Sequence, residues 1–281
     1  MVVSFIELIK VIIIGIVEGI SEWLPISSTG HMLLVDEFIR MDVSDSFKEM
    51  FFVVIQLGAI LAVVLVFWKK MWPFDFKSKG EGVIRKDIFS IWFKVVVACI
   101  PGAIVTLLFD DYVEAHLETP TIISCALIFY GIAFIVVENM NKSRVARIEG
   151  IHDITYKTAF VIGLFQVLSI IPGTSRSGAT IIGALLIGVS RVAAAEFTFF
   201  LAVPVMFGLS FIKLLKFGFH YSQAEIVVLL VGVVVAFTVS LFVIKFLMQY
   251  IKKHDFKVFG WYRIVLGVIV LIYFGVKTVL A

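Results

Sequence analysis

EGISEWLPISSTGH, residues 18–31, follows directly on the apolar run VIIIGIV at residues 11–17. The first stretch holds two glutamates, a proline, hydroxyl side chains, a glycine and a histidine. The second stretch is apolar and resembles a segment that lies in lipid. A polar sequence in such a place needs an explanation, and that explanation determines the predicted fold.

The composition of the whole chain explains the setting of this stretch. Of the 281 residues, 61% are hydrophobic and only 16% are charged, whereas soluble domains are about half apolar and about a quarter charged. Apolar runs of membrane-spanning length recur along the chain, and in lipid only helices or a closed barrel satisfy the backbone. Because the runs do not alternate, they favour helices. We therefore predict an all-α polytopic membrane protein forming a single integral membrane domain over residues 1–281.

The distribution of charge predicts topology rather than a charged partner. The net charge is only +3, so lysine and arginine serve as orientation signals, and we expect membrane lipid but no nucleic acid as a partner. Cys99 and Cys125 lie inside apolar runs, which indicates packing roles and no disulfide.

Six segments are predicted to cross the membrane, namely 51–68, 91–109, 121–138, 194–213, 224–248 and 258–280. Loops rich in lysine and arginine stay in the cytoplasm, which places the loops 69–86, 139–157 and 249–257 there. The mostly acidic loops 36–49 and 110–120 are expected outside.

Threading the chain through these loops leaves two segments that return to the side from which they start. Residues 158–190 begin and end in the cytoplasm, and residues 5–36 begin and end outside if the N-terminus is outside. Each is therefore predicted to be a re-entrant helical hairpin. A conventional crossing by residues 5–35 is the alternative, and it would place the N-terminus inside.

An internal repeat supports the two hairpins. Three matches share one offset of 148 (175 minus 27): SSTG at 27–30 with SRSG at 175–178, Gly15-x-x-Glu18 with Gly163-x-x-Gln166, and Phe51-Phe52 with Phe199-Phe200. We predict two inverted-topology repeats, about 1–140 and 150–281, each a re-entrant hairpin plus three transmembrane helices. Interrupted segments at corresponding places of such repeats point to a site in mid-membrane.

The first candidate groups are the carboxylates Glu18 and Glu22, which are four residues apart and share one helix face. Carboxylates inside a membrane are costly and usually functional. Together they can hold a divalent metal cation, with substrate phosphates as further ligands, or they can transfer protons. A pair that lies at the interface and reaches water is the alternative.

The SSTG turn adds a histidine and three hydroxyls. His31 alone would be an ordinary structural residue, but beside the glutamates its imidazole can act as acid, base or nucleophile. Ser27, Ser28 and Thr29 precede Gly30, so the turn can present backbone N–H groups to an anion at a helix start. Plain helix capping is the alternative and is compatible with that role.

The second copy, PGTSRSGAT at residues 172–180, supplies Arg176 at the position of Ser28. A guanidinium group in a buried turn predicts an anionic partner, because its planar fork fits phosphate or carboxylate. A structural lock between Arg176 and Glu18 or Glu22 is the alternative. Further substrate-binding donors are expected from Thr174, Ser175, Ser177, Gly178 and Thr180.

Gln56, in VVIQLGAI, either faces the site or bonds to a neighbouring helix. The whole set combines an anion clamp, a metal site and a proton-transfer group, which is the equipment of phosphoryl transfer.

EGISEWLPISSTGH and PGTSRSGAT closely resemble the two signature motifs of the undecaprenyl-diphosphate phosphatase family, also called the bacitracin-resistance protein family. The first matches the family pattern EGxTEFLPxSSTGH, with Ser21 for the usual Thr and Trp23 for the usual Phe. The resemblance runs through nearly the whole chain, including FxVVIQLGAILAVV around Gln56.

This resemblance implies a multi-pass hydrolase of the bacterial cytoplasmic membrane whose active site faces outside. It would convert undecaprenyl diphosphate to undecaprenyl phosphate and phosphate, recycling the lipid carrier of cell-wall synthesis, and its overproduction would confer bacitracin resistance. The family implies a polyprenyl diphosphate lipid as partner and Mg²⁺ or Ca²⁺ as cofactor. Carried over by motif, the functional residues are Glu18, Glu22, Ser28, His31, Ser175, Arg176 and Thr180.

Several alternatives stay open from sequence. The nucleophile is His31, Ser28 or water, with His31 slightly favoured as base or nucleophile. A transporter or flippase of prenyl phosphate lipids would use the same inverted-repeat site. The oligomeric state is not readable, and a homodimer is compatible with the sequence.

Overall fold

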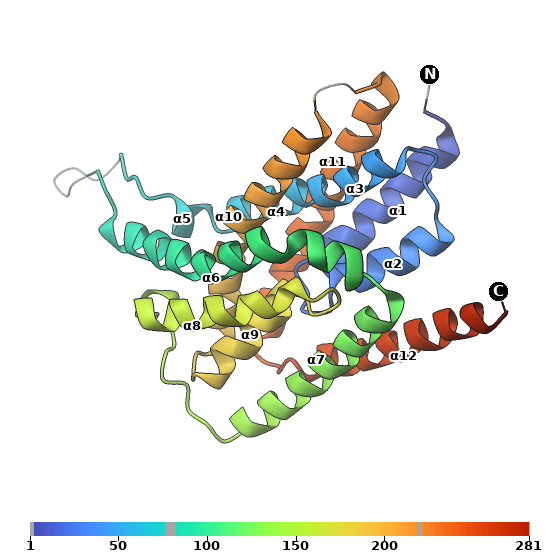
Figure 1. The fold of residues 1–281 in the computed structure, drawn as a ribbon. Helices are drawn as coiled ribbons and strands as arrows, with labels where there is room; N and C mark the ends of the chain where they lie inside the picture. Colours follow the sequence, from blue (N-terminus) through green and yellow to red (C-terminus); the bar gives the residue numbers. More distant parts are fainter. Residues whose placement is uncertain (1–2, 77–82, 219–220, 281) are drawn as a thin grey trace.

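The computed structural model describes residues 3–76, 83–218 and 221–280, and every regular element in these ranges is helical (Figure 1). The first half contains α1 (Phe5–Ser21), α2 (Ser28–Phe38), α3 (Asp45–Val54), α4 (Gln56–Val66), α5 (Trp68–Met71), α6 (Lys86–His116) and α7 (Pro120–Asn141). The second half contains η1 (Ile151–Asp153), α8 (Tyr156–Val167), η2 (Leu168–Ile170), α9 (Arg176–Leu186), α10 (Arg191–Phe217), α11 (Gln223–Tyr250) and α12 (Lys257–Leu280).

Six helical stretches of the described residues are long and apolar enough to cross a membrane: Asp45–Val66, Lys86–Phe109, Pro120–Asn141, Arg191–Phe217, Gln223–Tyr250 and Lys257–Leu280. Each overlaps one of the six predicted segments, so the all-α membrane fold is confirmed. Lys77 and Lys79, which served as orientation signals in the predicted loop 69–86, lie outside the described residues.

Two of these stretches differ in detail from the prediction. The first is interrupted at Ile55, where α3 ends and α4 begins. The second continues beyond the membrane-length part, so most of the predicted outer loop 110–120 belongs to α6, which ends at His116. Because no glycine or proline occurs between Gly102 and Pro120, nothing in that segment breaks the helix.

The helix pairs α1–α2 and α8–α9 are joined by turns of the same backbone conformation. Ser27 and Ser175 have φ values of 73° and 70°, and among the described residues they alone combine a side chain with a positive φ. Each serine hydroxyl accepts a hydrogen bond from the backbone N–H three residues on, at Gly30 and Gly178. Such strained positions concentrate at functional sites.

Small residues bring the helices around these turns close together. α1 packs along α11, α8 along α6, and α7 along α12 (Figure 1). A Cβ on Gly58 of α4 would lie 2.1 Å from the Val233 carbonyl oxygen, and one on Gly163 of α8 would lie 2.3 Å from that of Ala98. Glycine allows this approach of helix backbones inside a membrane.

Candidate active site

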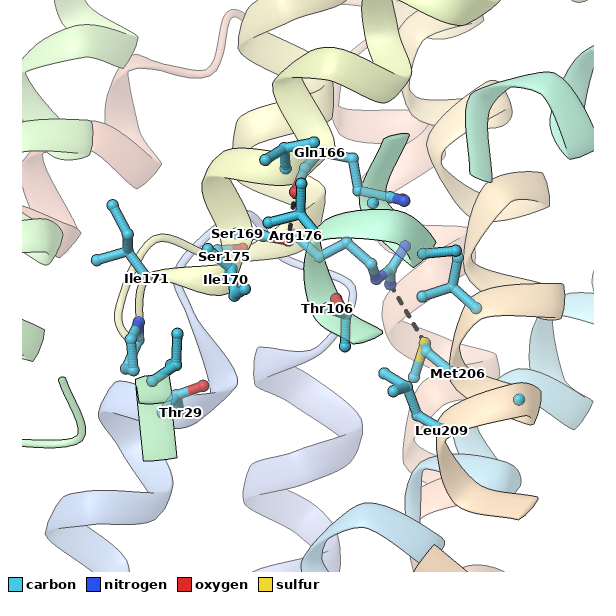
Figure 2. Close-up of a pocket in the computed structure, with 18 of the residues that line it drawn as sticks. Thr29, Thr106, Gln166, Ser169, Ile170, Ile171, Ser175, Arg176, Met206 and Leu209 are labelled. Atoms are coloured by element: carbon cyan, nitrogen blue, oxygen red, sulfur yellow. Dashed lines mark hydrogen bonds between the residues drawn. The ribbon is translucent and has the colours of Figure 1, made fainter. Parts of the chain in front are cut away.

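A cavity of about 520 Å³ opens beside the two turns. α4, α6, α8 and α10 supply its walls together with residues of both turns, and Figure 2 shows Thr29, Gln166 and Arg176 around it. Among the residues predicted for the site, those that line it are Glu22, Ser28, Thr29, Gln56, Ser175 and Arg176. Sequence segments nearly 150 residues apart thus contribute to one cavity.

One carboxylate connects the two copies of the repeat. Arg176 Nη2 donates to Glu22 Oε1 at 2.9 Å, and Ser28 Oγ donates to Glu22 Oε2 at 2.9 Å. The Arg176 and Glu22 side chains are only 12% and 9% exposed, so the pair lies in a medium of low polarity where its attraction is strong. The ion pair foreseen as an alternative is therefore present, and its carboxylate is Glu22 rather than Glu18.

The guanidinium group of Arg176 also makes hydrogen bonds to α10. Its Nη1 donates to the Thr198 carbonyl oxygen at 3.3 Å and its Nη2 to Met206 Sδ at 3.2 Å (Figure 2). Thr180 Oγ1 donates to the Arg176 carbonyl oxygen at 3.0 Å and shares a hydrogen bond with Thr198 Oγ1 at 2.9 Å. The guanidinium group is thus positioned before any ligand arrives, and it retains donors for an anion.

The remaining residues predicted for the site do not line the cavity, namely Glu18, Ser27, Gly30, His31, Thr174, Ser177, Gly178 and Thr180. Several of them support the wall instead. Ser27 and Ser175 cap α2 and α9, and Ser177 Oγ donates to the Glu22 carbonyl oxygen at 3.5 Å.

His31 has both ring nitrogens occupied. Nδ1 lies 2.7 Å from the Ser27 carbonyl oxygen and Nε2 lies 2.7 Å from the Tyr262 hydroxyl. Since a carbonyl only accepts, Nδ1 is the donor, and a neutral ring then accepts from Tyr262 at Nε2. This arrangement suits a residue that fixes the first turn against α12.

Glu18 lies in α1, one turn before Glu22, and is 1% exposed. Its Oε1 has no hydrogen-bond partner among the described residues, and Glu22 follows four residues later along the chain. A buried carboxylate oxygen is rarely left unpaired. This vacant oxygen beside a second carboxylate fits a cation ligand.

Sequence reasoning missed Arg263, which is fully buried in α12. Its Nη2 donates to the carbonyl oxygens of Gly173 and Thr174, both at 2.9 Å, and its Nη1 donates to that of Pro25 at 3.3 Å. Arg263 therefore ties the first turn to the second. An arginine within an apolar span is itself a signal of function, and WYRIVLG at 261–267 carried that signal.

Replacing Arg263 with methionine is expected to lower the free energy of unfolding by about 3–5 kcal/mol, because three buried carbonyls lose a charged donor. Thermal unfolding of the purified protein in detergent measures the loss. Lys257→Met removes a partly exposed charge that pairs with Asp255 at the start of the same helix and should change stability by less than about 1 kcal/mol. Equal melting of Arg263→Met and the parent would contradict the bridging role.

α6 and α10 supply an apolar part of the cavity lining that includes Val105, Leu107, Leu209 and Ile212, and Thr106 and Glu118 also line the cavity. One cavity thus combines an end that carries the Arg176–Glu22 ion pair and hydroxyl groups with an apolar part, and Arg176 could bind the anionic head group of an amphiphile.

Comparison with known proteins agrees with this chemistry. A family model described as bacitracin resistance protein BacA matches residues 11–269. An undecaprenyl-diphosphatase from Enterococcus faecalis is 70% identical over 272 residues, which cover 97% of this chain and 99% of the relative. Proteins of the same name from Desulfitobacterium hafniense and Lachnoclostridium phytofermentans are 59% and 63% identical, covering 99% and 96% of this chain and 99% and 98% of theirs.

Proposed function

Because the chain belongs to the bacitracin resistance protein BacA family, we propose that it hydrolyses undecaprenyl diphosphate to undecaprenyl phosphate and inorganic phosphate. This activity would return the lipid carrier to cell-wall synthesis and give resistance to bacitracin. The observation that carries the proposal is the contact of Arg176 and Ser28 with one carboxylate, Glu22, in a cavity that also has a hydrocarbon wall.

The cavity suggests how the substrate lies. The diphosphate occupies the end formed by Ser28, Ser175 and Arg176, where cationic and hydroxyl donors converge. The prenyl chain lies along the apolar wall between α6 and α10 and continues into lipid. Arg176 exchanges part of its contact with Glu22 for a phosphate, which its fork geometry favours.

We place Ser28 as the nucleophile. Its hydroxyl lines the cavity and donates to Glu22, so Glu22 is in position to take its proton as Oγ attacks the terminal phosphorus. The bond from this phosphorus to the bridging oxygen breaks, and the departing undecaprenyl phosphate receives that proton from Glu22. Water then attacks the phosphoserine; one of its protons returns through Glu22 to Ser28, and the other stays on the phosphate.

His31 takes a positioning role in this scheme. Sequence reasoning slightly favoured it as base or nucleophile, but the bonds of its two nitrogens to Ser27 and Tyr262 support a role in fixing the turn. Direct attack by water on the diphosphate is the remaining alternative, and the configuration at the transferred phosphorus distinguishes it from a phosphoserine.

A divalent cation, Mg²⁺ or Ca²⁺, is proposed to bind at Glu18 and Glu22. The unpartnered Oε1 of Glu18 supports this site, since such hard cations take carboxylate and phosphate oxygens as ligands. When bound, the cation would neutralise charge on the diphosphate from the side of Glu22, the one of the two carboxylates that lines the cavity.

The two turns also support the architecture that we propose for the membrane. Their shared conformation at Ser27 and Ser175 and their 148-residue offset favour two inverted repeats with re-entrant hairpins α1–α2 and α8–α9. The lysine and arginine distribution supports the proposed orientation of the loops, and the resemblance to the family implies a bacterial cytoplasmic membrane protein with its active site facing outside. The cavity forms within one chain, so the proposal holds whether or not two copies associate as a homodimer.

Purified protein in detergent is expected to release inorganic phosphate from undecaprenyl diphosphate, with loss of at least about tenfold in rate on EDTA treatment and recovery with Mg²⁺. A colorimetric phosphate assay measures both. Detergent removes the two-sided membrane, so a transporter or flippase using this site would release nothing.

Absence of phosphate release under any metal condition would refute the hydrolase. Release that is indifferent to EDTA would instead refute only the cation site at Glu18 and Glu22.

A further inference from the structure

Gln166 is a polar residue of the cavity wall that the scheme above does not use. It is the penultimate residue of α8 and is 4% exposed. Its side-chain Oε1 is buried without a hydrogen-bond partner among the described residues. Buried amide oxygens are nearly always satisfied, and the same side chain carries two N–H donors on Nε2, which are the groups that can meet an anion.

The opposite helix leaves room for this amide. A Cβ on Gly102 of α6 would lie 2.8 Å from Gln166 Nε2, so any larger residue there would push the amide aside. Both residues line the cavity. Gln166 and Arg176 flank the second turn, one at the end of α8 and the other at the start of α9 (Figure 2).

The repeat shows what distinguishes this position. Gln166 corresponds to Glu18 at the shared offset of 148, but Glu18 does not line the cavity and Gln166 does. A carboxylate at the position of Gln166 would face the diphosphate and repel it, whereas a carboxamide is neutral and has two N–H donors. Of these two corresponding residues, the one that lines the cavity is therefore the neutral one.

We propose that Gln166 is a further substrate-binding residue, whose amide donates a hydrogen bond to the diphosphate head group in the cavity. The inference rests on the proposed hydrolase function. Arg176 and Gln166 then bind the head group from the second copy, while Ser28 and Glu22 act on it from the first. The contact uses the N–H donors on Nε2, because phosphate oxygens accept hydrogen bonds and cannot serve the unpaired Oε1.

Gln166→Leu tests the proposal because it keeps the volume and removes the amide. We expect KM for undecaprenyl diphosphate to rise about tenfold or more, since one hydrogen bond to a charged group is lost. The melting temperature should stay equal or rise, because replacing an unpaired polar group by an apolar one does not weaken the fold. Gln166→Glu should raise KM further through repulsion, and Gly102→Ala should raise it by displacing the amide.

Leu164→Met is the matched control, since Leu164 lies in the same helix and is 47% exposed, away from the cavity lining; its KM should equal that of the parent. The proposal is overturned if Gln166→Leu keeps KM within twofold, or if its loss of activity follows a lower melting temperature, which would indicate a structural role. A parent protein that releases no phosphate refutes the proposed function instead, so the two failures are distinguishable.

Discussion

Replacing Arg176 with alanine is expected to reduce kcat/KM for phosphate release by about 10³- to 10⁵-fold, the range found when an arginine that stabilises phosphoryl transfer is removed. The side chain donates to Glu22, Met206 and the Thr198 carbonyl, so it is held in place for a phosphate. Arg176→Lys keeps the charge but loses the fork geometry, and we expect a loss of about 10²-fold or more. Initial rates of phosphate release at several substrate concentrations give both values.

Arg191→Lys is the matched control, because Arg191 also pairs with a buried carboxylate, that of Glu138, but lies outside the cavity lining. Its kcat/KM should remain within a few-fold of the parent. Removing Arg176 leaves Glu22 without its cation, so a melting temperature for each variant is needed to separate catalysis from folding. A folded Arg176→Ala protein with near-parental kcat/KM would exclude Arg176 from the chemistry.

Ser28→Ala is expected to lower kcat by about 10³-fold or more, because the attacking oxygen is removed, whereas His31→Ala should lower it by roughly tenfold through a looser turn. Rapid acid quenching of the parent with substrate labelled in its terminal phosphate should trap a phosphoserine that peptide mapping assigns to Ser28. The experiment compares directly a residue that lines the cavity with one whose nitrogens bind Ser27 and Tyr262.

Ser210→Ala serves as control for the serine substitution, since its hydroxyl donates to the Val53 carbonyl oxygen inside the helix bundle; its kcat should match the parent's. Inversion of configuration at the transferred phosphorus would establish direct attack by water and exclude the phosphoserine. Labelled phosphate attached to His31 instead of Ser28 would show that His31 is the nucleophile.

Much of the fold could be predicted because membrane insertion depends on local composition. A span is a run of apolar residues whose backbone satisfies itself, so each of the six segments is visible in its own stretch of sequence. The interruption at Ile55 and the extension of α6 to His116 were not predicted. Helix boundaries depend on a few caps and breakers rather than on the whole run.

For the candidate site, the residues could be predicted from sequence but their arrangement could not. Glu22, Ser28 and Arg176 could be selected from sequence because polar residues in a membrane are costly and therefore conspicuous. Their mutual geometry could not: Glu22 rather than Glu18 receives Arg176, and Glu18 lies apart from the cavity lining. From sequence alone, two carboxylates on one helix face are equally good partners for an arginine. Which of them makes the ion pair depends on the residues that pack against each.

By itself, the sequence determined the class of protein, its spanning segments and the paired SSTG and SRSG turns, since each depends on neighbours along the chain. Only the tertiary structure decided that Arg263 of α12 joins the two turns and that Gln166 lines the cavity, with its Oε1 unpaired among the described residues. The reason is physical: Arg263 and its carbonyl partners are about 90 and 238 residues apart. Whether a buried polar group is satisfied depends on atoms that folding brings to it from such distances.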